Sequence, residues 1–339
     1  MIRAAERFLF APGSGRRLLI TQVALAAVIG LRIAFGPFLD LADQPPALFR
    51  PVSFLRILDA MPGLATILTL QVGGTLAAAA AVAGWRRRAT FPTAWVCLLV
   101  LAGLRSSQGK LLHNDLLLLL AAVPFLAAPA VRRQHADDRL SARFGWPVRT
   151  ATVVVAGAYF FSGLAKMIHS GPAWVLSDSM RHVLDQAAGG GKVAFPEVPA
   201  WLAGQAGLAH GLAAGVLLLE LTFPIVLLAR SRRVSATYAI SAVALHAGTW
   251  LVLGLDYWAW AAVTAAVLVD GRPVIERLSR YRLRWRPRLL PPAGNPAGPA
   301  DVVPAQWREK AEDRTCENAA AGAHASVPPR SPPSPSPSS

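Results

Sequence analysis

Charged residues are scarce in this sequence. Only 16% of its 339 residues are charged and 54% are hydrophobic, whereas soluble domains carry about 25% charge. A soluble chain of this length would form about two domains, and so few charged groups could not cover their surfaces. The mean hydropathy of +0.41 points the same way. The composition therefore excludes a soluble enzyme and a disordered chain, and it predicts a polytopic membrane protein.

Cysteine and signature motifs are equally scarce. The two cysteines lie in an apolar run (Cys97) and in a polar segment (Cys316), so no disulfide framework is expected. No HExxH, paired CxxC or P-loop pattern occurs in the sequence. The histidines are too widely spaced for their positions to indicate a metal site, and we expect no metal.

Long apolar segments divide the sequence into eight predicted transmembrane helices and indicate an all-α bundle. A helix needs about 20 apolar residues to cross upright, so the third and eighth segments are short, and the long sixth segment is expected to tilt. The first follows Arg16-Arg17 without a clean cleavage site after it, which indicates a retained signal anchor. The predicted spans are Leu18–Gly36, Met61–Trp85, Phe91–Leu104, Leu111–Pro129, Thr150–Ile168, Trp201–Ala229, Val234–Gly254 and Tyr257–Asp270.

The basic residues give these spans an orientation. If the N-terminus is cytoplasmic, 26 of the 34 Lys and Arg residues fall in cytoplasmic segments, as the positive-inside rule requires. A seven-span alternative would place a basic segment outside. The net charge of +15 therefore mainly fixes orientation. We expect an integral protein of the plasma membrane, in a bacterium the inner membrane, with both termini in the cytoplasm.

Three regions follow: a cytoplasmic N-terminal segment (1–17), the transmembrane domain (18–270) and a tail (271–339). The tail holds 13 of the 27 prolines, a composition that predicts disorder. Its basic, aromatic start at 280–288 favours the anionic lipids of the inner leaflet. Nucleic-acid binding is the rival interpretation, but basic segments beside a membrane are common. We therefore expect membrane lipids, and no nucleic acid, as partners.

Polar residues inside a membrane span are costly and commonly functional. In this sequence they gather toward the outer face. Lys166 is the clearest case. It shares a helix face with Tyr159, Ser162 and Gly163, and this small, polar face should turn toward protein. Lys166 could simply snorkel to the interface. Alternatively, burial disfavours a charged amine, and a neutral amine can act as a general base.

Other polar residues near the same face have two interpretations each. His113 opens the fourth span and is either interfacial or close to the candidate base. His210 and His246 either belong to a pocket or form interhelical hydrogen bonds. Arg32 either holds a phosphate or another anion or balances a carboxylate, and Glu220 should be protonated or paired. The candidate site comprises the catalytic candidates Lys166 and His113 and the pocket residues Arg32, Tyr159, His210, Glu220 and His246.

Two local patterns lie near these residues. The stretch 174–187 is amphipathic, which predicts an interfacial helix that either covers a pocket or only connects two spans. Gly207, Gly211 and Gly215 form two small-xxx-small steps, which predict the close approach of another helix.

The sequence around Lys166 resembles a known family. Tyr159-Phe-Phe-Ser-Gly163-Leu-Ala-Lys166-Met, followed by Trp174, is similar to the pattern of the HTTM (horizontally transferred transmembrane) proteins, which are related to vitamin K-dependent gamma-carboxylase. The resemblance covers roughly Leu18 to Asp270. Weaker matches occur in the same order, at Leu31-Arg32-Ile33, His113-Asn-Asp-Leu-Leu, Glu220 with Pro224, and His246.

The resemblance implies a membrane enzyme that uses a reduced quinone of the vitamin K type, with Lys166 as the base and His113 in support. Ala165 replaces the first of the two adjacent lysines of the carboxylase motif. The carboxylase also has a large lumenal C-terminal region that the proline-rich tail does not resemble, so recognition of a peptide substrate is not implied. One subgroup assists maturation of a secreted toxin. A non-catalytic accessory protein that assists a secreted or membrane protein partner is therefore the alternative, and a small transporter is a third possibility.

Overall fold

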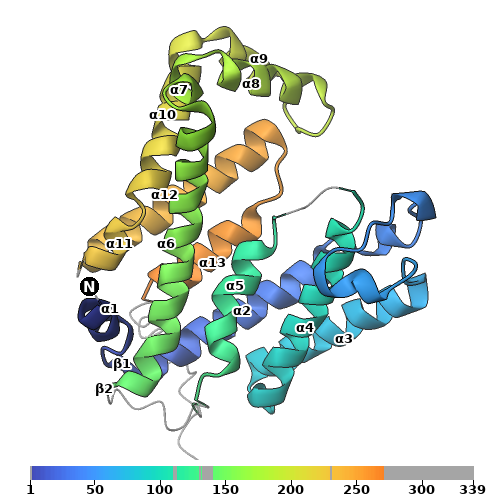
Figure 1. The fold of residues 1–339 in the computed structure, drawn as a ribbon, viewed down its shortest axis with the longest axis vertical. Coiled ribbons are helices and arrows are strands. Elements are labelled where there is room, and N and C mark those ends of the chain that lie inside the picture. Colours follow the sequence, from blue (N-terminus) through green and yellow to red (C-terminus); the bar gives the residue numbers. More distant parts are fainter. Residues whose placement is uncertain (1, 110–112, 130, 132–139, 230, 271–339) are drawn as a thin grey trace, which may run out of the picture. The chain divides into compact units, whose positions relative to one another are not determined.

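The computed structural model describes residues 2–109, 113–129, 131, 140–229 and 231–270, and the tail predicted for 271–339 lies outside the described residues. Within these ranges the chain is a bundle of helices (Figure 1). Six are long and apolar enough to cross a membrane, which confirms the predicted all-α membrane fold. They are α2 (Gly15–Phe35), α3 (Leu64–Ala83), α4 (Arg87–Ser106), α6 (Ala142–Ser170), α10 (Ala206–Thr222) continued by α11 (Ile225–Leu228), and α12 (Arg232–Leu253).

Two shorter apolar helices occupy the positions of the predicted fourth and eighth spans. They are α5 (Leu116–Leu126) and α13 (Trp258–Leu268), with 11 residues each, or about 16 Å of helix at 1.5 Å per residue. The prediction had made the third span short, and here it was wrong. The third, α4, has 20 residues because its helix begins at Arg87, within the basic segment that the apolar criterion excluded.

The predicted sixth span is divided by its backbone. The first residues of this predicted span are the last residues of α9 (Glu197–Gly204). This helix ends before Gln205, a residue with non-helical dihedral angles. The second break comes at Pro224, where α10 has ended and α11 begins. Proline has no N–H to continue a helical ladder, so this break has a simple local cause. Trp201 therefore belongs to a separate short helix that packs against α8 (Ser179–Gly189).

Serine residues begin three of the long helices. Ser14, Ser141 and Ser231 each accept a hydrogen bond from a main-chain N–H of the first turn of α2, α6 and α12, as N-cap residues do. The antiparallel strands β1 (Gly13–Ser14) and β2 (Leu140–Ser141) pair directly before α2 and α6. The first helix, α1 (Ile2–Leu9), contacts α6. The starts of α2 and α6 therefore lie at one end of the bundle.

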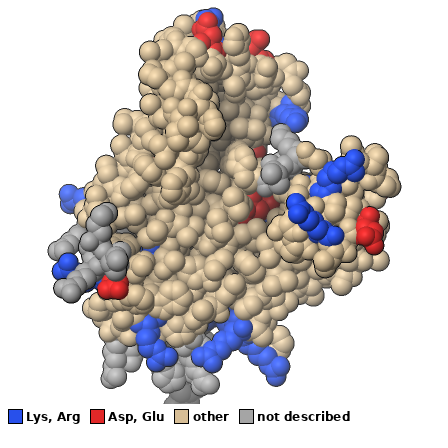
Figure 2. Space-filling model, viewed as in Figure 1, with Lys and Arg blue, Asp and Glu red and all other residues tan. Residues whose placement is uncertain are grey.

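Helix α2 forms much of the core. It contacts α3, α4, α5, α6 and α13, and its apolar side chains Leu18, Leu25, Ile29 and Ile33 are fully buried. By contrast, other helices expose large apolar side chains such as Phe161 and Ile240. In Figure 2, Lys and Arg gather along the lower edge of the visible face, whereas its middle is nearly uncharged. Such a surface suits a protein whose sides face hydrocarbon.

Short elements connect the long helices. The 3₁₀ turns η1 (Leu39–Leu41), η2 (Pro46–Leu48) and η3 (Ser53–Ile57) lie between α2 and α3. After α6, Gly171 adopts a φ of +58°, a conformation that favours glycine, and the chain turns into α7 (Ala173–Leu176) and α8. The stretch 174–187, predicted as one helix, forms two helices in the structure.

Candidate functional site

A cavity of about 350 Å³ lies at the end of the bundle where α6 and α12 finish. Helices α6, α7, α8, α10, α12 and α13 line it, together with the α12–α13 connection and His113 before α5. The cavity includes both catalytic candidates, Lys166 and His113. It also includes three of the five predicted pocket residues, Tyr159, Glu220 and His246.

Lys166 and Glu220 form the charged part of this cavity. Lys166 Nζ lies 2.7 Å from both carboxylate oxygens of Glu220 and donates to Ser162 Oγ at 3.0 Å. Ser162 Oγ also donates to the Glu220 carboxylate at 3.1 Å. The two charged side chains are 19% and 8% exposed, so water screens the pair poorly. The amine considered as an isolated base from the sequence is therefore hydrogen-bonded to a carboxylate and a hydroxyl group.

Gly163 allows α10 to approach α6 at this pair. A Cβ at Gly163 would lie 2.9 Å from the Cβ of Glu220. We expect Gly163→Ala to lower the free energy of unfolding by about 1–3 kcal/mol because the added methyl group overpacks the contact. Unfolding with sodium dodecyl sulfate in mixed micelles measures this. Gly157→Ala is the control, because a Cβ there meets only the Phe161 ring at 3.8 Å. Equal stabilities of the two variants would contradict the prediction.

Trp174 covers the amine from α7. Lys166 Nζ lies 5.4 Å from the centroid of the Trp174 ring, within the range of a cation–π interaction. The indole Nε1 of Trp174 is buried and has no hydrogen-bond partner in the described part of the chain. Trp174 also lines the cavity, and a ligand oxygen brought next to its N–H group could accept a hydrogen bond from it.

Tyr159 and His246 form a second polar group on the cavity wall. The Tyr159 hydroxyl lies 2.8 Å from His246 Nε2 and 3.2 Å from Thr264 Oγ1. The other ring nitrogen, His246 Nδ1, is buried without a partner among the residues described. The Tyr159 ring stacks on Phe223 with the centroids 4.1 Å apart. His246 therefore makes the interhelical hydrogen bond that was one of its two interpretations, and it also lines the cavity.

His113 is held by aromatic residues that also contact the Tyr159–His246 pair. Its Nε2 lies 2.7 Å from the Tyr257 hydroxyl, and its main-chain oxygen accepts a hydrogen bond from Trp260 Nε1 at 3.2 Å. Both aromatic residues also line the cavity. Neither was a candidate from the sequence, because tyrosine and tryptophan near the end of a span are ordinary interfacial residues.

Arg32 lies outside the lining of the cavity, in a buried cluster of its own. Its Nε donates to Asp115 and its Nη1 to Asp256 Oδ2 at 2.6 Å. Of the alternatives raised by the sequence, the structure shows Arg32 balancing carboxylates. Asp115 stands at the N-cap of α5, but its side chain makes no capping hydrogen bond. Asn114 Nδ2 instead donates to the main-chain oxygen of Asp256 at 2.6 Å.

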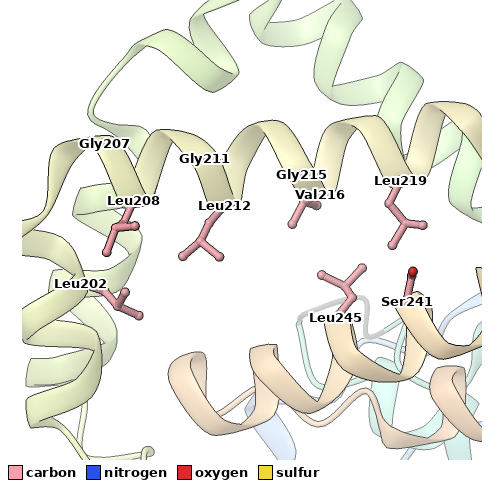
Figure 3. A pocket seen from close by; sticks show the side chains of 10 residues that line it. All are labelled: Leu202, Gly207, Leu208, Gly211, Leu212, Gly215, Val216, Leu219, Ser241 and Leu245. Atoms are coloured by element: carbon pink, nitrogen blue, oxygen red, sulfur yellow. The ribbon is translucent and has the colours of Figure 1, made fainter.

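His210 is also absent from this cavity, and the glycines around it border a different feature. A groove of about 430 Å³ runs between α10 and α12. Figure 3 shows leucines of α10 pointing across it toward Leu245. A Cβ at Gly207, Gly211 or Gly215 would meet nothing within 4 Å. The close helix approach predicted from these glycines is therefore wrong for the described residues. The groove shares Val216 and Leu245 with the cavity.

The arrangement supplies hydrogen bonds, charge and aromatic surface. Among the described residues, no three His, Cys, Asp or Glu side chains are grouped as a metal site would require. The acid–base groups in contact are instead the Lys166–Glu220 pair, the Tyr159–His246 pair and the Tyr257–His113 pair. Such a site can bind a small aromatic molecule that carries oxygen atoms and can accept its proton.

Comparison of the chain with family models, curated proteins and solved structures gives no match. The resemblance to the HTTM proteins therefore stays a prediction, and the chemistry of this site has to be argued from its own side chains.

Proposed function

We propose that this chain is an integral membrane protein that binds a reduced quinone in the cavity and takes a proton from it. The observation that carries the proposal is the Lys166–Glu220 pair, with both N–O distances at 2.7 Å, inside an aromatic cavity that also contains the unpartnered Trp174 Nε1. Aromatic walls suit a planar ring, and the indole N–H and the ammonium group suit its oxygen atoms.

The geometry supports a division of the base function between the two residues. A bound quinol supplies an acidic hydroxyl group and a store of electrons. When that O–H bond breaks, Glu220 accepts the proton and the bonding electrons stay on the ligand oxygen. Lys166 remains an ammonium group and donates a hydrogen bond to that oxygen, where it stabilises negative charge. The Ser162 hydroxyl group contacts both groups and holds them in this arrangement. We thus propose the pair, instead of Lys166 alone, as the base.

We further propose that the cavity opens toward the outer leaflet of the plasma membrane and that both termini are cytoplasmic. An arginine lies at the start of each of four long helices, α2, α4, α6 and α12: Arg16, Arg86, Arg143 and Arg233. The cavity lies where α6 and α12 end, so the starts of these two helices are at the end of the bundle away from it. Arg232 also contacts Asp270, just after α13, so these two helix termini share one end. A basic end away from the cavity supports this orientation.

Binding of a quinone to the purified protein tests the proposed function. The full chain is reconstituted in nanodiscs, its co-purified quinones are identified by mass spectrometry, and a reduced menaquinone is titrated against tryptophan fluorescence. We expect Lys166→Met and Glu220→Gln to weaken binding by about tenfold or more, since each removes a charge-assisted hydrogen bond worth about 1.5–3 kcal/mol.

Lys192→Met is the matched control for this experiment. Lys192 is an exposed lysine in the α8–α9 connection, so its replacement should leave the affinity unchanged. Equal affinity of Lys166→Met and the unmodified protein would overturn the proposed site. If the unmodified protein bound no quinone and purified with a secreted or membrane protein, the accessory function raised by the sequence would take its place.

A further inference from the structure

A buried ion-pair cluster lies directly behind the His113 wall of the cavity. Arg32 comes from α2, which contributes no residue to the cavity lining. Its side chain is 3% exposed and contacts two carboxylates from separate segments, Asp115 at the start of α5 and Asp256 between α12 and α13. These two segments are the ones that carry His113 and Tyr257 to the cavity.

The spacing along the chain connects the cluster to the wall. His113 precedes Asp115 by two residues, and Tyr257 directly follows Asp256. Asn114, between the first two, donates to the main-chain oxygen of Asp256 at 2.6 Å. Every residue from 113 to 115 thus contacts the 256–257 segment or the arginine that holds it. A shift of either aspartate must therefore move His113 or Tyr257.

We propose that Arg32 is a positioning residue for the cavity: by holding Asp115 and Asp256 together, it sets the distance between His113 and Tyr257. Without the guanidinium group, the buried carboxylate of Asp115 would lose this ion pair and would repel that of Asp256, and the segments that carry them would separate. The planar guanidinium group can serve both carboxylates at once, whereas the ammonium group of a lysine is a single point charge. This inference rests on the proposed function only where ligand affinity is concerned.

The experiment compares Arg32→Gln with Arg32→Lys and with Asp256→Asn in the full chain in nanodiscs. One measurement is the affinity for reduced menaquinone. The other needs no ligand: it is the rate at which diethyl pyrocarbonate modifies His113, read by mass spectrometry relative to the exposed His182 of the same molecule. We expect Arg32→Gln to weaken binding by about tenfold. Diethyl pyrocarbonate should modify His113 several times faster in this variant, because the Tyr257 hydroxyl group no longer occupies His113 Nε2. Arg32→Lys should restore part of the affinity and part of the protection of His113.

The control is Arg232→Gln, which removes an exposed arginine that pairs with Asp270 at the other ends of α12 and α13. It should change neither measurement. If Arg32→Gln does not fold because Asp115 is left buried and unpaired, Asp256→Asn decides, since it keeps the Arg32–Asp115 pair. Unchanged His113 modification in every folded variant would overturn the inference. Absence of quinone binding by the unmodified protein would instead refute the proposed function, while the modification rates would still test the positioning role.

Discussion

Replacing Glu220 by alanine will destabilise the protein more than replacing Glu220 and Lys166 together. Glu220→Ala leaves a lysine that is only 19% exposed, with Ser162 as its remaining hydrogen-bond partner among the described residues and with the Trp174 ring beside it. Removing one partner of a buried pair costs about 3–5 kcal/mol, because the remaining charge is uncompensated. The double variant Lys166→Met/Glu220→Leu fills a similar volume with apolar atoms, and such replacements are often nearly neutral.

The measurement is the free energy of unfolding in mixed micelles for Lys166→Met, Glu220→Leu and the double variant, combined as a thermodynamic cycle, with Glu220→Ala measured beside them. Asp178→Ala is the control, because it breaks the Arg181–Asp178 pair, whose side chains are 38% and 56% exposed. An exposed pair contributes about 0–1 kcal/mol. If the losses from the two single variants simply added in the double variant, the stability of the site would not come from the pair.

The sequence was sufficient to predict the fold class but not all helix lengths. Apolar runs located the six long apolar helices and the two shorter ones approximately, because apolar length is what a bilayer selects. The boundaries failed where other forces act. The side chains of Asn114 and Asp115 contact Asp256 and Arg32, and α5 begins only after them. Arg87 begins α4 although it is charged. The serine N-caps before α6 and α12 were readable signals, since serine is a preferred residue at that position.

Single residues of the candidate site could be predicted from the sequence, but their pairing could not. Lys166 stood out because a lysine in an apolar run is unusual, and its partner Glu220 stood out for the same reason. Their pairing joins positions 54 residues apart, which no local pattern encodes. Asp256 looked like an ordinary loop aspartate, yet it contacts Arg32 across 224 residues. Only the packing of α2 against α5 and α13 makes that contact.

Truncating Tyr159 to alanine should be among the most destabilising single changes in the transmembrane domain. The side chain is 2% exposed, stacks on Phe223 and meets the edge of Trp260 at 5.9 Å. Loss of a buried aromatic ring leaves a cavity and costs about 3–5 kcal/mol. Tyr159→Phe keeps the ring and loses only the hydroxyl group that His246 and Thr264 contact, which should cost about 1–3 kcal/mol.

Unfolding of both Tyr159 variants in mixed micelles separates packing from hydrogen bonding. Phe161→Ala provides the control on the same helix, because Phe161 is 65% exposed, and its loss should change stability by about 0.5 kcal/mol or less. A Tyr159→Ala variant as stable as Phe161→Ala would show that this face of α6 does not pack as described. If only the phenylalanine variant kept most of its stability, the ring would hold α6 against α13 and the junction between α10 and α11, and the hydroxyl group would mainly orient His246.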